Sequence, residues 1–143
     1  MAGATTPETS IRQAIEARNA ALSAKDVAGV MACGAPGFVS YSLAPPLKDA
    51  GGRAGLAGWF ATWDGPIGYE LRGLKITTGE AVAFAHGLVH MTGRKTDGEA
   101  VDLWFRQTLG LKLFRGAWKI VHEHDSVPFY MDGSFRAAVD LTP

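Results

Sequence analysis

The fold is decided near the C-terminus, in residues 118–126, which read Trp-Lys-Ile-Val-His-Glu-His-Asp-Ser. Aromatic and β-branched residues alternate there with polar ones, which is typical of a half-buried strand. Arg115-Gly116 supplies a hairpin turn between this strand, predicted over 117–127, and another long strand over 100–114. A short turn makes its two strands antiparallel neighbours, so the C-terminal part is expected to form an antiparallel sheet.

Two earlier strands are expected to extend this sheet, over 68–77 and 80–92. The turn Thr96-Asp97-Gly98 connects the second of them to the strand at 100–114. The four strands together form a meander in which each strand lies next to the one before it.

The N-terminal part of the chain is mostly helical. Helical spacing and capping residues predict three helices, over 7–23, through Val27, Val30 and Met31, and over 51–63. One strand, 38–42, interrupts them, and Pro45-Pro46 after it cannot donate to a β ladder. Helices followed by a meander indicate an α+β fold, a curved antiparallel sheet wrapped around the helices with room for a cavity between them.

Length, charge and cysteine content exclude several classes of protein. The 143 residues fit one domain, residues 1–143, of which 1–6 are expected to be flexible. Lys plus Arg (14) equals Asp plus Glu (14), which argues against a nucleic-acid surface or a polybasic membrane anchor. No apolar run approaches the roughly 18 residues of a membrane span, and the N-terminus lacks the features of a secretory signal, so a cytoplasmic protein is expected. The single cysteine, Cys33, excludes an internal disulfide.

The histidines of the C-terminal strand are the first candidates for chemistry. Alternation along the strand places five side chains on one face: Trp118, Ile120, His122, His124 and Ser126. The other face then receives Lys119, Val121, Glu123 and Asp125. Because the first face begins with two apolar residues, we expect it to point inward and to continue as a polar wall. Histidine suits proton transfer near neutral pH, so His124 is the predicted catalytic residue, with His122 and Ser126 in the pocket beside it. The alternative is that these histidines only hydrogen-bond their neighbours.

Aromatic and cationic side chains elsewhere are candidates for lining the same pocket. Tyr41, Trp59 and Trp63 either stack against a ring-shaped apolar ligand or pack in the core. Trp104 and Arg106 share one face of their strand. Arg106 is either an outward charge or an anchor for an acidic ligand, since a buried guanidinium needs an anionic partner.

Spacing argues against three other kinds of site. His122 and His124 project the same way about 7 Å apart, but no thiolate or obvious carboxylate completes a ligand set, so no metal is predicted. Ser126, His124 and Asp125 do not form a nucleophilic triad, because consecutive strand residues point to opposite faces. The glycines of 51–55 lack the spacing of a phosphate-binding loop or dinucleotide fingerprint, so no nucleotide cofactor is predicted.

Four segments of the C-terminal half together resemble the SnoaL-like, ketosteroid-isomerase-related proteins of the nuclear-transport-factor-2-like (NTF2-like) superfamily. They are Phe-Ala-His-Gly at 84–87, Thr-Asp-Gly-Glu at 96–99, Asp-Leu-Trp-Phe-Arg-Gln-Thr at 102–108, and the run at 118–128. The match covers about residues 80–141, with W-x-I-x-H-x-H-x-S as its more specific motif. The resemblance implies a cone-shaped α+β fold, three N-terminal helices packed in a strongly curved sheet around a hydrophobic pocket, and frequent homodimers packed through the sheet.

The same resemblance leaves the activity open between two classes. Ketosteroid isomerases use a carboxylate base on the first strand with a tyrosine and a protonated aspartate as oxyanion donors, but 38–42 has no acid and 7–23 no tyrosine. SnoaL-type polyketide cyclases use acid/base residues and no cofactor, a role that His124 could fill, with Arg106 or Tyr41 stabilising an enolate. We therefore expect a cofactor-free isomerase, cyclase or dehydratase for an apolar or acidic small molecule. The alternative is a non-catalytic binding or assembly domain, because protein-kinase hub domains show a similar histidine run.

Overall fold

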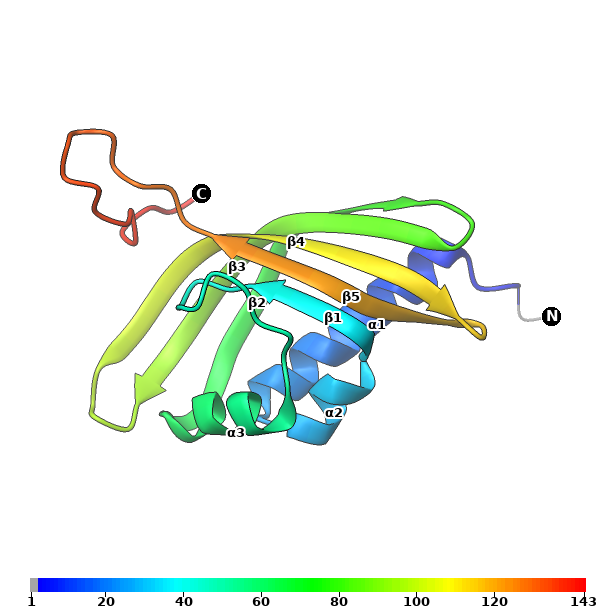
Figure 1. Cartoon of the computed structure of the whole chain (residues 1–143), viewed down its shortest axis with the longest axis horizontal. Helices are drawn as coiled ribbons and strands as arrows, with labels where there is room; N and C mark the ends of the chain where they lie inside the picture. Colours follow the sequence, from blue (N-terminus) through cyan, green and yellow to red (C-terminus); the bar gives the residue numbers. More distant parts are fainter. Residues whose placement is uncertain (1–2) are drawn as a thin grey trace.

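The computed structural model describes residues 3–143, which form a layer of helices against one curved sheet (Figure 1). The helices are α1 (Pro7–Ser23), α2 (Val27–Ala32) and α3 (Arg53–Ala61). The strands are β1 (Gly34–Tyr41), β2 (Trp63–Thr78), β3 (Val82–Lys95), β4 (Ala100–Phe114) and β5 (Ala117–Ser126). The predicted α+β architecture, with N-terminal helices and a curved sheet, is confirmed.

The five strands lie in the order β1-β5-β4-β3-β2. Neighbours from β2 to β5 are antiparallel, as the predicted meander requires. The edge strand β1 instead runs parallel to β5, with Tyr41 opposite His124. We call the face of the sheet toward the helices the inner face and the opposite face the outer face (Figure 1).

The predicted element boundaries hold best where local signals are strong. The bounds of α1 are as predicted, and Thr6 caps the helix by accepting a hydrogen bond from the Thr9 backbone N–H at 3.2 Å. Strand β1 begins before Pro36 rather than after it, because an edge strand tolerates a residue that cannot donate to the ladder. Of residues 1–6, predicted to be flexible, 1–2 lie outside the described residues.

Two apolar clusters fill the space between the helices and the inner face. The first packs Ile11 and Ile15 of α1 against Leu109 and Leu111 of β4 and their neighbours. The second consists of Leu22, Phe60, Trp63 and Ile67.

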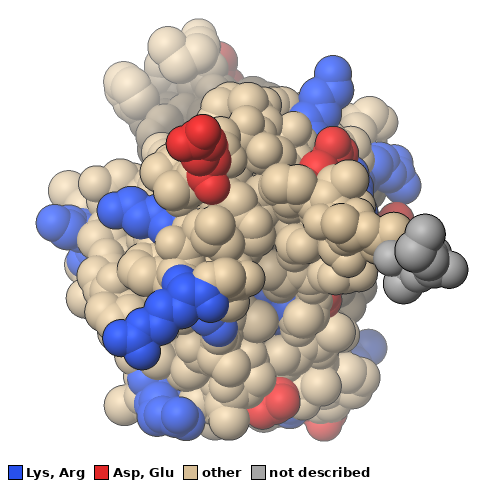
Figure 2. All heavy atoms as spheres, turned by 90° about the vertical axis from the view of Figure 1, so that its right-hand side faces the viewer, with Lys and Arg blue, Asp and Glu red and all other residues tan. Residues whose placement is uncertain are grey.

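Uncharged side chains cover most of the end of the molecule that Figure 2 shows. Within residues 3–143, no helix has both the length and the apolar composition needed to cross a membrane.

A β-bulge at Val121 reverses the faces of β5. Ile120 pairs with Leu111 of β4 and His122 pairs with the adjacent Gly110, so Val121 has no partner of its own on that strand. Before the bulge Trp118 and Ile120 are buried. One inserted residue turns every later side chain over, so the inward positions that follow belong to Glu123 and Asp125.

The predicted alternation of β5 is therefore wrong beyond Ile120. His122, His124 and Ser126 lie on the outer face, and the acidic residues that were expected outside lie inside. A strict period of two cannot locate an extra residue within a strand, and the bulge is the physical reason for the error.

Candidate functional site

Five polar side chains form a cluster on the inner face, between the two apolar clusters. They are Arg18 of α1, Tyr69 of β2, Gln107 of β4, and Glu123 and Asp125 of β5. We call them the inner polar cluster. On α1 and β4 the polar residue interrupts an apolar stripe: Arg18 follows Ile11 and Ile15, and Gln107 lies between Phe105 and Leu109. The cluster is thus a polar layer across an otherwise apolar interior.

A buried ion pair anchors one side of the inner polar cluster. Arg18 Nη2 donates to Glu123 Oε1, and each side chain is only 9% exposed. The other guanidinium nitrogen, Nη1, lies 3.4 Å from the hydroxyl oxygen of Tyr69. Removing two charges from water is costly unless each finds its partner, so this pair fixes α1 against β5.

Gln107 connects the other members of the inner polar cluster. Its Nε2 lies 2.8 Å from the Tyr69 hydroxyl, 2.9 Å from Glu123 Oε1 and 3.0 Å from Asp125 Oδ1. An amide nitrogen carries two protons, so it can donate to only two of these three oxygens at a time. The Gln107 Oε1 atom is buried and has no hydrogen-bond partner among residues 3–143.

The environment of the inner polar cluster keeps two acidic groups neutral. Burial, followed by the nearby Glu123 carboxylate, raises the pKa of Asp125 to about 8. Burial also raises the pKa of the Tyr69 phenol above its usual value. Asp125 is therefore mostly a carboxylic acid at pH 7, and both groups present an O–H. A phenol and a neutral carboxylic acid can both donate to an oxyanion, such as the oxygen of an enolate.

Three of the predicted site residues meet on the outer face instead. The Tyr41 ring lies edge-on to the rings of His122 and His124, with centroids 4.9 and 5.4 Å away. His122 Nδ1 lies 2.7 Å from the carbonyl oxygen of Val39, which joins β5 to β1. The structure thus brings Tyr41, His122 and His124 together, on the side of the sheet away from the inner polar cluster.

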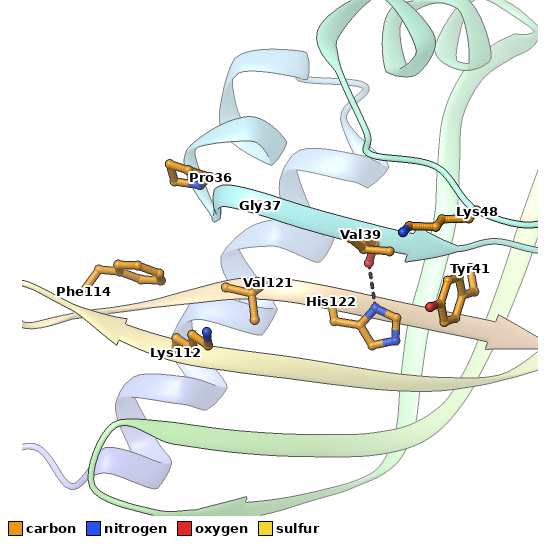
Figure 3. A pocket seen from close by; sticks show the side chains of 9 residues that line it. All are labelled: Pro36, Gly37, Val39, Tyr41, Lys48, Lys112, Phe114, Val121 and His122. Atoms are coloured by element: carbon orange, nitrogen blue, oxygen red, sulfur yellow. Dashed lines mark hydrogen bonds between the residues drawn. The ribbon is translucent and has the colours of Figure 1, made fainter.

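Tyr41 and His122 border an open groove of about 460 Å³ along β1 and β5 (Figure 3). We call it the outer groove. Its apolar walls come from Val39, Tyr41, Phe114 and Val121, and Lys48 and Lys112 lie toward its opposite ends (Figure 3). No acidic residue lines it.

Trp104, Arg106 and Ser126 lie on another part of the outer face. Arg106 Nε donates to the Ser126 hydroxyl at 3.1 Å. The Trp104 ring stacks on His90, with centroids 4.3 Å apart, and the guanidinium of Arg72 lies 4.7 Å from its centroid. Arg106 also borders a hollow of about 600 Å³ that it shares with Arg72, His86 and Thr108.

The two remaining predicted pocket residues lie at the second apolar cluster. Trp63 is buried, Trp59 packs against it with ring centroids 5.7 Å apart, and Lys95 Nζ lies 4.0 Å from the Trp63 ring centroid. The Trp63 indole Nε1 is buried without a hydrogen-bond partner among residues 3–143. The predicted pocket residues therefore occupy three separate places and do not line one cavity together.

Sequence reasoning missed Arg18, Tyr69 and Gln107. A signal was present for two of them, because a polar residue that interrupts an apolar stripe has to be satisfied inside the fold. Tyr69 carries no such signal, since tyrosine is common in half-buried strands. Within residues 3–143, no three His, Cys, Asp or Glu side chains are grouped so as to hold a metal ion.

Comparisons with known proteins identify a family and several solved structures that this chain resembles. The SnoaL-like domain family matches residues 11–130 of the chain. No curated protein matches it. A solved NTF2-like protein of unknown function from Pseudomonas putida KT2440 is 29% identical, with a TM-score of 0.86 over 99% of this chain and 100% of that one.

Two more distant structures share the fold. The association domain of calcium/calmodulin-dependent protein kinase II from C. elegans is 17% identical, with a TM-score of 0.66 over 83% of this chain and 94% of that one. A candidate ketosteroid isomerase from Shewanella frigidimarina is 20% identical, with a TM-score of 0.68 over 82% of this chain and 94% of that one. One of these two is an association domain and the other a candidate isomerase, so the fold alone does not choose between a binding or assembly domain and an enzyme.

Proposed function

This chain belongs to the SnoaL-like domain family of the NTF2-like superfamily, and from that premise we propose that its inner face binds a small carbonyl compound and catalyses acid/base chemistry on it. The reaction class is isomerisation, cyclisation or dehydration. The observation that carries the proposal is the place of Asp125 in the inner polar cluster, where its Oδ1 lies 3.0 Å from Gln107 Nε2 and where burial and the Glu123 carboxylate raise its pKa to about 8. Tyr69 beside it supplies a second O–H group.

The chemistry needs one proton to leave a substrate carbon and one to reach a substrate oxygen. Asp125 can give its proton to the carbonyl or leaving oxygen and then take a proton from the neighbouring carbon, which regenerates the carboxylic acid. A group with a pKa near the working pH performs both transfers most efficiently. Tyr69 supports the transition state by donating to the same oxygen. The charge of Glu123 favours reprotonation of Asp125, because two carboxylates in one buried site repel each other.

The test begins with a ligand. A thermal-shift screen with small carboxylates, phenols and steroids identifies compounds that stabilise the chain, and hits are then assayed for proton exchange or turnover. Asp125→Asn should abolish turnover of a hit and retain its binding, whereas Tyr69→Phe should reduce turnover by about 10²-fold, the effect of losing one oxyanion donor. Turnover that survives Asp125→Asn contradicts the assignment.

A second candidate function is non-catalytic binding of an acidic small molecule on the outer face. The observation in its favour is the hollow bordered by Arg72, His86, Arg106 and Thr108, which no acidic residue lines. Arg72 and Arg106 both face Leu88 across neighbouring strands, so two guanidiniums flank one position of the sheet. Arginine pairs in this way suit carboxylate or phosphate ligands.

The catalytic role of His124 stays a prediction, and this second candidate function assigns no catalysis to it. His124 lies opposite Thr108 of β4 and Tyr41 of β1, next to the hollow rather than at the inner polar cluster. Stabilisation by carboxylates that disappears in Arg106→Ala but persists in Asp125→Asn would favour outer-face binding, and the reverse pattern would favour the inner face. The cytoplasmic location and the homodimer stay predictions.

A further inference from the structure

The C-terminal residues 127–143 form an arm with a structure of its own. The arm continues β5 and projects away from the helices and the sheet (Figure 1). It folds back on itself, with Phe129 bridged to Ala137 and the Tyr130 backbone N–H donating to the Arg136 carbonyl at 2.9 Å. The backbone of the arm is therefore organised although no helix or strand of the body covers it.

Large apolar side chains of this arm face the solvent. Their exposed fractions are 60% for Phe129, 91% for Met131, 74% for Phe135, 54% for Val139 and 46% for Leu141. A single exposed hydrophobic residue is ordinary, but five between Phe129 and Leu141 are a local concentration of exposed apolar side chains, as at interaction sites. Such an arm is a candidate for contact with a second surface.

The same chain carries a surface of matching chemistry, the outer groove. Its walls are apolar and aromatic, and its only charged residues are Lys48 and Lys112, toward opposite ends (Figure 3). The arm carries two acidic residues, Asp132 and Asp140, and one basic residue, Arg136. Hydrogen bonds from Ser134 and from Tyr130 lower the pKa of Asp132 and of Asp140 respectively, so both are carboxylates at neutral pH. The arm is thus apolar with acidic residues and the outer groove is apolar with basic residues, so the two surfaces are complementary.

The arm does not reach the outer groove of its own chain. It leaves β5 after Ser126 and runs away from the sheet (Figure 1), whereas the groove follows β1 and β5 back toward Pro36 and Phe114. No residue of the arm lines the groove. Every copy of the chain nevertheless carries both surfaces, so two copies can cover each other through two identical contacts about a twofold axis.

We propose that two copies of this chain exchange their C-terminal arms, each arm packing its apolar side chains in the outer groove of the other copy. Asp132 and Asp140 of each arm then lie near Lys48 and Lys112 of the partner copy's groove. This assembly uses no residue of the inner polar cluster, and it gives a role to the exposed arm, which the proposed catalysis does not use.

The dissociation constant of the dimer, measured by analytical ultracentrifugation, tests this inference. Phe135→Asp should weaken the dimer about tenfold or more, because it places a charge in the apolar contact. Asp140→Lys and Lys112→Glu should each weaken it as well, because each places like charges across both contacts. Lys75→Glu is the matched control, since Lys75 is an exposed lysine of β2 outside the groove and should leave the dissociation constant unchanged.

A mixture of the two charge variants gives the sharper measurement. An Asp140→Lys copy and a Lys112→Glu copy should form a mixed dimer, while each variant alone dimerises weakly. In the mixed dimer one contact keeps the natural pair of Asp140 and Lys112, and the other contact pairs the two introduced charges, which are also opposite in sign. Circular dichroism verifies that every variant is folded. A monomer at all concentrations, a dimer unaffected by the arm and groove variants, or no preference for the mixed dimer would overturn arm exchange. None of these results bears on turnover by Asp125.

Discussion

Asp125 Oδ1 lies 3.0 Å from Gln107 Nε2 and accepts a hydrogen bond from it. Because an amide nitrogen only donates, the acidic proton of Asp125 belongs on the other oxygen, Oδ2. The hydrogen bond from Gln107 does not involve that oxygen. The carboxylic acid is therefore oriented by one oxygen and free to donate from the other, as a general acid has to be.

The raised pKa of Asp125 predicts how stability depends on pH. The unfolded carboxyl ionises near its ordinary value of 3.8, whereas the folded one keeps its proton up to about pH 8. The native state thus binds more protons between these values, and this group makes the free energy of unfolding fall as pH rises from about 4 to about 8, by at most about 1.4 kcal/mol per pH unit.

Urea unfolding at several pH values checks this dependence. Asp125→Asn should remove the decline, so the variant gains stability relative to the wild type as pH rises from about 4 to about 8. Asp64→Asn, at an exposed carboxyl of β2, serves as the control and should leave the profile unchanged. Parallel profiles for the wild type and Asp125→Asn would show that Asp125 is ionised in the native state.

The buried ion pair predicts unequal effects of single and double substitutions. Glu123→Gln removes the carboxylate that pairs with the buried Arg18 guanidinium and should lower the free energy of unfolding by about 3–5 kcal/mol. Arg18→Leu combined with Glu123→Leu removes both charges and should be the less destabilising change. Denaturant titration of the three proteins measures the difference. A double variant at least as unstable as Glu123→Gln would refute the account.

The bulge in β5 predicts that deletion is tolerated better than insertion. Deleting Val121 lets His122 follow Ile120 directly, which gives a regular ladder on Gly110 and Leu111 and keeps Glu123 inside. Inserting one alanine after Val121 instead turns Glu123 outward and leaves Arg18 unpaired, at a cost of about 3–5 kcal/mol. Thermal unfolding of the two variants should rank the deletion above the insertion, and the opposite ranking would contradict the assigned bulge.

Trp63 predicts a steric effect at a glycine of the neighbouring strand. A Cβ added at Gly93 would lie 2.8 Å from Trp63 Cζ3, and the ring is buried and cannot move aside freely. Gly93→Ala should therefore destabilise the chain by about 1–3 kcal/mol. Gly55→Ala is the matched control in α3, where a Cβ would meet nothing within 4 Å, and should stabilise by about 0.5–1 kcal/mol. Equal melting temperatures for the two variants would count against the close packing.

Most of the fold could be predicted from the sequence because its signals are local. Helix α1 and strand β4 have the predicted bounds, since capping and alternation act within a few residues. The parallel pairing of β1 with β5 joins opposite ends of the chain and leaves no local trace. On β5 the predicted faces are wrong because of the extra residue Val121, which places Glu123 and Asp125 rather than the histidines on the inner face.

The C-terminal arm follows directly on β5, the strand that carries Asp125. Asp125 is followed directly by Ser126, the last residue of β5, and the arm begins at the next residue, so no flexible linker separates the site from the assembly surface. If the chain binds a ligand at Asp125 and associates through the arm, as proposed above, a ligand that shifts β5 would alter self-association, and by thermodynamic reciprocity association would alter ligand affinity by the same factor. Occupancy of the inner site would in this way be sensed by the partner copy, and the concentration of the protein itself would become an effector of its chemistry.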